Sequence, residues 1–270
     1  MLIPLDIPQK MHKTFQANYK AITKNSDKLF LFAADHKIEH LQPLVAEELF
    51  KFAAQPEIGA FATHLGLIAR YGHGHPDISY VVKLNSKTNL LTPRDPVSRQ
   101  LWSVDDVITF QKNSGLNIRG VGYTVYLGSE FEATMLKEAA QIVFQAHQHG
   151  LVAVLWVYPR GKWVENEYAT AVTAGAAGVA NSLGADFVKL KVPKVAKGES
   201  MQQAIELAVQ AAGNTKVLFS GGETEKPAVF LKRVREQLNA GSSGAAVGRN
   251  IFELEEKEAL AMIKNLWKLL

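Results

Sequence analysis

The sequence contains no cysteine among its 270 residues, which excludes disulfides, cysteine nucleophiles and thiolate metal sites. It also lacks an apolar run long enough to cross a bilayer, and its start lacks the basic region and long apolar core of a signal peptide. The net charge of +4 comes from lysines scattered among acids, not from the basic block typical of nucleic-acid binding. These absences predict a cytoplasmic protein with neither a nucleic acid nor a membrane as partner. The mild positive charge suits an anionic small-molecule substrate.

The remaining composition, 47% hydrophobic and 21% charged, is that of one large globular α/β domain. Short β-like runs alternate with segments of helical periodicity. The runs cover 28–34, 58–63, 80–85, 121–126, 152–158, a lysine-bearing stretch within 184–193, 216–220 and 245–248, and helical stretches include 132–149, 169–183, 201–212 and 227–238. This alternation predicts a (β/α)₈ TIM barrel.

An open doubly wound sheet shares the alternation but needs a glycine-rich phosphate turn after its first strand, where this chain has Asp35, His36 and Lys37. No linker or repeat indicates a second domain, so we expect residues 1–270 to form a single barrel. Residues 1–27 are predicted to be a short N-terminal helical extension that closes the barrel bottom. Residues 89–106, with Pro93 and Pro96, are expected to form a long loop over the active face.

Two lysines, Lys189 and Lys191, stand two residues apart in an apolar run, so in a strand both point to one face. Inside a barrel, burial and mutual repulsion favour the loss of a proton, and one amine becomes nucleophilic near neutral pH. Lys189 is therefore the candidate Schiff-base former, and Lys191 is expected to lower its pKa. The alternative is that both side chains snorkel outward to solvent.

Barrel enzymes place their chemistry at the carboxyl ends of the strands. Asp35 ends the first run with inward parity, and Trp156, Tyr158 and Arg160 share one face at the end of the fifth. A carboxylate, a phenol and a lysine at one mouth form an acid/base set around an imine, with Trp156 as a wall of the pocket. Taken singly, Tyr158 also suits a hydrogen-bonded core tyrosine, and Asp35 a helix cap.

The last two runs carry glycine at the place where barrels commonly bind phosphate through backbone amides. Glycine permits close approach of the backbone, and an arginine adds a bidentate cation. The predicted phosphate-binding residues are Ser220, Gly221, Gly222, Gly248 and Arg249. The alternative is two ordinary glycine turns and a surface arginine.

These motifs in this order resemble the archaeal-type class I fructose-bisphosphate aldolases, a family that includes related transaldolases acting on other phosphorylated ketones. The resemblance runs from about residue 29 to 252 and also covers 84–88 and 122–126. It implies a Schiff base at Lys189, proton transfer by Tyr158 and assistance by Asp35. His36, Trp156, Arg160 and Lys191 join the glycines and Arg249 in substrate binding. No metal or cofactor is implied, and ring-based homo-oligomers, decamers among them, are expected.

Several positions around the substrate mouth depart from the family pattern. Lys37 and Glu130 stand where glycine is common, Val192–Val195 replaces a Tyr-Thr-Gly-like stretch, and the 89–106 loop is longer than usual. The imine machinery is therefore better defined than the sugar. We expect cleavage or condensation of a phosphorylated ketose, with fructose 1,6-bisphosphate or a related sugar phosphate as substrate.

Three alternatives remain open. One is a transaldolase- or thiolase-like relative that acts on another phosphorylated ketone, and another is a non-catalytic phosphate-binding barrel. The third is a metal-dependent aldolase or hydrolase, which would use histidine pairs such as His36 with His40, or His73 with His75. The first pair would share a face only on a helix, and the second has no obvious third ligand.

Overall fold

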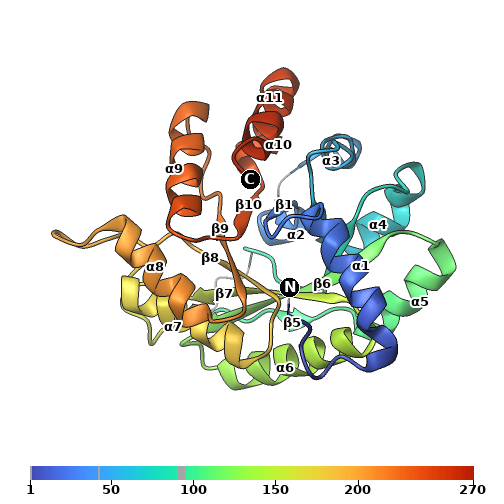
Figure 1. The fold of residues 1–270 in the computed structure, drawn as a ribbon, viewed down its shortest axis with the longest axis horizontal. Helices are drawn as coiled ribbons and strands as arrows, with labels where there is room; N and C mark the ends of the chain where they lie inside the picture. Colours follow the sequence, from blue (N-terminus) through green and yellow to red (C-terminus); the bar gives the residue numbers. More distant parts are fainter. Residues whose placement is uncertain (1, 42, 91–94) are drawn as a thin grey trace.

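The computed structural model describes residues 2–41, 43–90 and 95–270. Its strands close into a parallel barrel in the order β1-β10-β9-β8-β7-β6-β3-β2 (Figure 1). The barrel strands are β1 (Leu29–Ala33), β2 (Ala60–His64), β3 (Tyr80–Lys83), β6 (Ile118–Leu127), β7 (Val152–Pro159), β8 (Phe187–Leu190), β9 (Lys216–Ser220) and β10 (Gly244–Val247). The predicted TIM barrel is confirmed, and each predicted run overlaps one of these strands.

Helices cover the outside of the barrel and return the chain from one strand to the next (Figure 1). They are α1 (His12–Thr23), α2 (His36–Glu39), α3 (Ala46–Ala53), α4 (Leu65–Tyr71), α5 (Val104–Ser114), α6 (Glu132–Gln148), α7 (Thr170–Ser182), α8 (Met201–Ala212), α9 (Pro227–Asn239), α10 (Arg249–Phe252) and α11 (Glu256–Trp267), with 3-10 turns η1 (Gln9–Met11) and η2 (Gly72–Gly74). Helices α6 to α9 lie within two residues of the predicted helical stretches.

Two hydrophobic clusters follow from the period-2 alternation of the strands. Outward residues pack under the helices, whereas inward residues such as Leu31, Val154 and Phe187 fill the barrel. The inner cluster also contains Phe15, Tyr19 and Ile22 of α1, so this helix packs against the amino-terminal end of the barrel core.

Polar contacts hold the N-terminal segment on that end. The buried His147 ring of α6 lies between two carboxylates, with Nδ1 2.7 Å from Asp6 Oδ2 and Nε2 3.2 Å from Asp186 Oδ2. Asn18 of α1 donates to the Gly150 carbonyl at 2.8 Å. The segment before β1 is therefore tied to the barrel by hydrogen bonds as well as by apolar packing.

The segment between β3 and β6 differs from the single long loop expected over 89–106. Strand β5 (Arg99–Gln100) pairs antiparallel with β4 (Asn85–Ser86), and α5 already begins at Val104. The helix begins there because Ser103 and Asp106 form a capping box, in which the Ser103 hydroxyl accepts from the Asp106 N–H at 3.0 Å. The predicted loop is thus shorter, and Pro93 lies outside the described residues.

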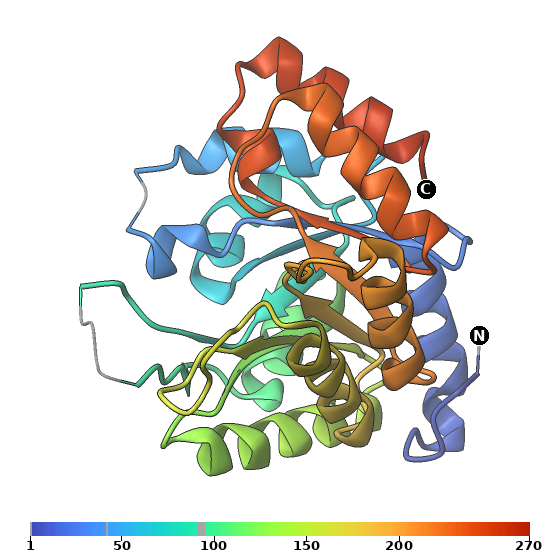
Figure 2. The same cartoon turned by 90° about the vertical axis from the view of Figure 1, so that its left-hand side faces the viewer.

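Loops that follow the strands at their carboxyl ends gather on one side of the molecule, drawn on the left in Figure 2, and both termini lie toward the other side. Asp95 joins two of these connections, because its carboxylate accepts from the N–H groups of Glu130 at 2.7 Å and Lys162 at 2.6 Å. The residues predicted to carry the chemistry lie on this carboxyl-end side.

Candidate active site

Lys189 lies inside the mouth of the barrel, as its parity predicted. It is 6% exposed and is paired in register with Trp156 of β7, and its Nζ lies 5.4 Å from the centre of that indole ring. Trp156 is itself buried, and Gly122 of β6 makes room for its ring. The predicted wall and the predicted nucleophile are therefore neighbours.

The electrostatics of the mouth favour a neutral amine at Lys189. Burial lowers its pKa, the carboxylates of Asp35 and Glu39 act in the opposite direction, and the cations Lys83 and Arg249 lower it further. Its Nζ has no hydrogen-bond or ion-pair partner among the described residues. A buried amine with a lowered pKa and no partner is suited to attack a carbonyl carbon.

Asp35 follows β1 and is 5% exposed. Although it occupies the N-cap position of α2, its side chain makes no capping hydrogen bond. Burial by itself would raise the pKa of Asp35, but the charge of Lys189 when it is protonated, together with that of Lys83, outweighs burial and holds the pKa below its usual range. The carboxylate therefore stays ionised and faces the amines.

Two histidines beside these charges are held neutral. Burial lowers the pKa of His36 to about 4, with Lys189 acting in the same direction, and burial and Lys83 lower that of His64 to about 4. His36 Nδ1 and both ring nitrogens of His64 are buried without a hydrogen-bond partner among the described residues. Such nitrogens are free to bind a polar ligand.

Tyr158 lies near the end of β7, in register with Tyr126 of β6, and their ring centres are 6.3 Å apart. Burial raises the pKa of Tyr158 well above its usual value, and the charges of Asp35 and Glu39 add to this effect. Tyr126 donates to Glu39 Oε1 at 3.1 Å. Because its pKa is raised, the Tyr158 phenol stays protonated near neutral pH, as a proton donor must.

Arg160 and Lys191 share the carboxylate of Glu167, not that of Asp35. Arg160 Nε donates to Glu167 Oε2 at 3.0 Å, and Lys191 Nζ donates to Glu167 Oε1 at 2.6 Å and to the Tyr168 hydroxyl at 3.1 Å. Strand β8 ends at Leu190, so Lys191 leaves the strand and reaches this pair. The expected lowering of the Lys189 pKa by Lys191 is therefore corrected: the neighbouring lysine is Lys83.

The glycines after β9 and β10 lie side by side, because Gly221 N–H donates to the Ala246 carbonyl at 2.9 Å. The buried Asn250 side chain shapes the first loop by donating to the Gly221 and Glu223 carbonyls, each at 3.0 Å. Gly222 has φ +70°, a left-handed conformation that glycine adopts without strain. Gly248 packs tightly on the Ala33 carbonyl and on the His36 ring.

Arg249 follows Gly248 and is partly exposed, and it forms no ion pair among the described residues. Its charge reaches Lys189, where it lowers the amine pKa. The predicted phosphate residues and the predicted nucleophile therefore belong to one mouth.

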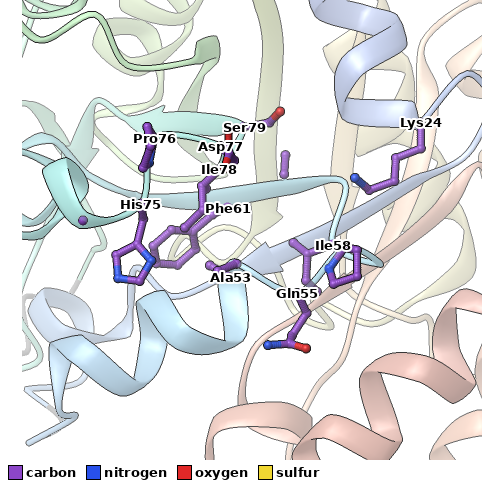
Figure 3. A pocket seen from close by; sticks show the side chains of 14 residues that line it. Lys24, Ala53, Gln55, Ile58, Phe61, His75, Pro76, Asp77, Ile78 and Ser79 are labelled. Atoms are coloured by element: carbon purple, nitrogen blue, oxygen red, sulfur yellow. The ribbon is translucent and has the colours of Figure 1, made fainter.

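A large cavity lies at the other end of the barrel. It has a volume of about 430 Å³, and its walls are the loops that precede β2 and β3, with the side chains of Lys24, Gln55 and His75 around it (Figure 3). These residues lie on the amino-terminal face, where barrel residues generally serve stability. The site is therefore defined by the strand ends, not by this cavity.

The histidine pairs considered for a metal lack further ligands among the described residues. His36 and His40 stack at 5.2 Å because residues 36–39 form α2, and Asn89 Nδ2 lies 3.0 Å from His40 Nδ1. His75 instead contacts the Phe50 ring. Across the described ranges, no three histidine, aspartate or glutamate side chains form a group that could hold a metal ion.

Sequence reasoning missed Lys83, His64, Glu39 and Tyr126. Lys83 and His64 each end a strand two residues after a member of the inner cluster, Val81 and Ala62, so their side chains point inward as well. A search of the strand ends could therefore have found both. Glu39 gave no such signal, because it comes from the turn of helix after β1.

No helix in the described ranges is long and apolar enough to span a membrane.

Comparison with known proteins identifies a family and relatives of this chain. A family model described as DeoC/LacD family aldolase matches residues 29–254. The fructose-bisphosphate aldolase/6-deoxy-5-ketofructose 1-phosphate synthase of Methanocaldococcus jannaschii is 45% identical over 98% of this chain and 88% of its own length. The class 1 fructose-bisphosphate aldolase of Thermoproteus tenax is 35% identical over 90% of this chain and 89% of its own length.

Solved structures of fructose-bisphosphate aldolases are similar to this chain in fold and in sequence. A fructose-bisphosphate aldolase from Slackia heliotrinireducens superposes with a TM-score of 0.95, is 42% identical, and aligns over 98% of this chain and 88% of its own. A Schiff-base-forming fructose-1,6-bisphosphate aldolase superposes with a TM-score of 0.81 at 32% identity, over 94% of this chain and 99% of its own. The predicted family is confirmed: the chain belongs to the DeoC/LacD aldolases and resembles their class I fructose-bisphosphate aldolase members.

Proposed function

We propose that this protein is a metal-independent class I aldolase that cleaves or forms a carbon–carbon bond in a phosphorylated ketose through a Schiff base on Lys189. The observation that supports the proposal most is a buried amine with a lowered pKa, unpartnered within the described residues, beside an ionised carboxylate and a protonated phenol. No cofactor is required, because the iminium itself is the electron sink.

In the mechanism, neutral Lys189 attacks the ketone carbon to give a carbinolamine, and loss of water yields the iminium. A substrate hydroxyl then passes its proton through the Tyr158 phenol to the Asp35 carboxylate, which returns it to Tyr158 for the next step. The carbon–carbon bond breaks, and its electron pair moves into the iminium to give an enamine and a free aldehyde. Tyr158 gives the enamine carbon its proton, and water hydrolyses the imine and regenerates the amine. Asp35 orients the hydroxyl and assists imine formation and hydrolysis.

The phosphate group is assigned to the paired loops after β9 and β10. Gly221, Gly222 and Gly248 let the backbone approach an anion, and Arg249 supplies a cation that forms no ion pair within the described residues. Ser220, His36 and Trp156 complete the binding surface in this proposal. Arg160 and Lys191, joined through Glu167, are assigned to the part of the mouth that follows β7 and β8.

The two relatives from Methanocaldococcus jannaschii and Thermoproteus tenax bear two activity names between them, fructose-bisphosphate aldolase and 6-deoxy-5-ketofructose 1-phosphate synthase. Both concern ketose phosphates, so we take a sugar phosphate of this class as the substrate. We further propose that the chain acts in the cytoplasm as a single barrel domain with a short N-terminal extension, within a ring-based homo-oligomer.

The function is tested by reductive trapping. The protein is incubated with dihydroxyacetone phosphate or fructose 1,6-bisphosphate and borohydride, and the mass of the intact chain is measured. Wild type should gain one ketose-phosphate adduct, and Lys189→Ala should gain none, while Lys191→Ala should still be trapped. Trapping that survives in Lys189→Ala and disappears in Lys191→Ala would move the imine to Lys191.

Two rival functions give different results. A non-catalytic phosphate-binding barrel would bind the sugar phosphate without forming an adduct. A metal-dependent aldolase would cleave the substrate but lose activity in EDTA, whereas the proposed enzyme should keep full activity.

A further inference from the structure

A second lysine lies in the mouth beside the proposed imine residue. The Lys83 side chain is 3% exposed, its Nζ is 3.8 Å from Asp35 Oδ2, and it lies 5.3 Å from the centre of the Trp156 ring. Lys189 Nζ lies 5.4 Å from the centre of the same ring. Both buried amines therefore lie at the Trp156 ring, Lys83 pairs with Asp35, and the charge of Asp35 also acts on Lys189.

The two amines differ in what holds them. Lys83 Nζ donates to the Asn85 main-chain carbonyl at 3.0 Å and to Asn85 Oδ1 at 3.2 Å. Asn85 is itself fixed, because its amide donates to the Ser98 carbonyl at 2.9 Å and to the Thr124 carbonyl at 2.8 Å. Lys83 thus has three fixed oxygen partners, which suit an ammonium ion, whereas Lys189 has none within the described residues.

We propose that Lys83 is a positioning residue whose ammonium holds Asp35 as its ion-pair partner, so that Lys189 remains the neutral amine of the pair. The inference rests on the proposed Schiff-base function. Without Lys83, the carboxylate of Asp35 would act on Lys189 alone and favour its ammonium form, which has no lone pair to attack a ketone. Two residues of one type therefore have opposite tasks.

Other charged and titratable groups face this trio from the surrounding elements. Burial lowers the pKa of both amines, Asp35 and Glu39 act in the opposite direction on both, and Arg249 lowers that of Lys189 further. The remaining groups are His36 of α2, His64 of β2 and Tyr158 of β7. Both histidines have pKa values of about 4 and the Tyr158 pKa is raised well above 10.0, so none of the three should titrate between pH 6 and 9. A change of rate in that range therefore reports the two lysines, and in a variant without Lys83 it reports Lys189.

The test is the pH dependence of trapping with dihydroxyacetone phosphate and cyanoborohydride, followed by intact mass. In Lys83→Met, the rise of the trapping rate with pH (the rising limb) should begin about one pH unit or more higher than in wild type, and much of the wild-type rate should be recovered at high pH. Lys83→Arg keeps the charge and should stay near the wild-type limb, as should Lys112→Met, an exposed control on α5. A limb that does not move in Lys83→Met, or a loss of rate that is equal at every pH, would overturn the proposal.

Two additions keep the test decisive. Acetylation of Lys189 by acetic anhydride, measured on its peptide, follows the same amine without any substrate. If wild type forms no adduct with a ketose phosphate, the proposed function fails. The pH dependence of Lys189 acetylation, compared between wild type and Lys83→Met, still decides the role of Lys83. If Lys83→Met does not fold, the variant carrying both Lys83→Met and Asp35→Asn removes both charges, and the pH profile of Lys189 acetylation in this variant, which needs no imine, should lie close to that of wild type. An upward shift there like that expected for Lys83→Met would contradict the proposal.

Discussion

Replacing Gly122 by alanine should damage the active site, although glycine carries no chemical group. A Cβ at this position would lie 2.3 Å from Cζ3 and 2.6 Å from Cη2 of Trp156, whereas ordinary contacts begin at 3.4 Å. The ring would therefore have to retreat by about 1 Å into a packed interior. Overpacking of this kind costs roughly 1–3 kcal/mol of the free energy of unfolding.

The same displacement should slow the reaction. The Trp156 ring lies 5.4 Å from Lys189 Nζ and 5.3 Å from Lys83 Nζ, so moving it disturbs both amines. A misplacement of about 1 Å near reacting groups can cost roughly a hundredfold in rate. We expect a loss of this order in kcat for cleavage of the ketose phosphate.

Urea unfolding and steady-state kinetics measure the two effects. Gly66→Ala is the matched control, because a Cβ on that exposed α4 residue meets no atom within 4 Å. Combining Gly122→Ala with Trp156→Phe, which removes the ring atoms that clash, should restore part of the lost stability. The reasoning is refuted if Gly122→Ala unfolds and turns over like wild type, or if the second substitution restores nothing.

Three further predictions concern separate parts of the molecule. Tyr158→Phe should still form a trapped adduct while its turnover falls by roughly a hundred- to ten-thousandfold, and turnover at the wild-type rate would reassign the proton transfer. Arg249→Ala should raise KM for a phosphorylated ketose by roughly ten- to a thousandfold and barely change that for an unphosphorylated one, whereas equal losses on both would remove its phosphate role. Burial alone would lower the pKa of His147, but Asp186 and Asp6 outweigh burial and raise it. The contribution of protonated His147 to the free energy of unfolding is therefore complete below about pH 6.5 and is lost as the pH rises through the raised pKa. In urea unfolding, His147→Leu should therefore cost about 3–5 kcal/mol at pH 6 and less at pH 8.5, and an equal cost at both values would contradict a protonated imidazole.

The sequence by itself determined the barrel and which candidate site residues lie at its mouth. Period-2 alternation in the strands fixed which residues point inward, so Lys189, Asp35 and Tyr158 were all predicted to face the mouth, and the structure places them there. The glycines after the last two strands were equally readable, because neighbouring parallel strands bring their carboxyl ends together. Local spacing suffices for such features.

Tertiary structure decided which charges meet. From spacing alone Lys191 was the expected neighbour of Lys189, yet the chain leaves β8 at Leu190 and Lys191 pairs with Glu167. The amine that faces Asp35 is Lys83, more than a hundred residues away from Lys189 in sequence and on a strand that does not adjoin β8. Closure of the barrel brings such distant strand ends to one mouth, and electrostatic interaction depends on that distance in space and on burial, neither of which a linear pattern records.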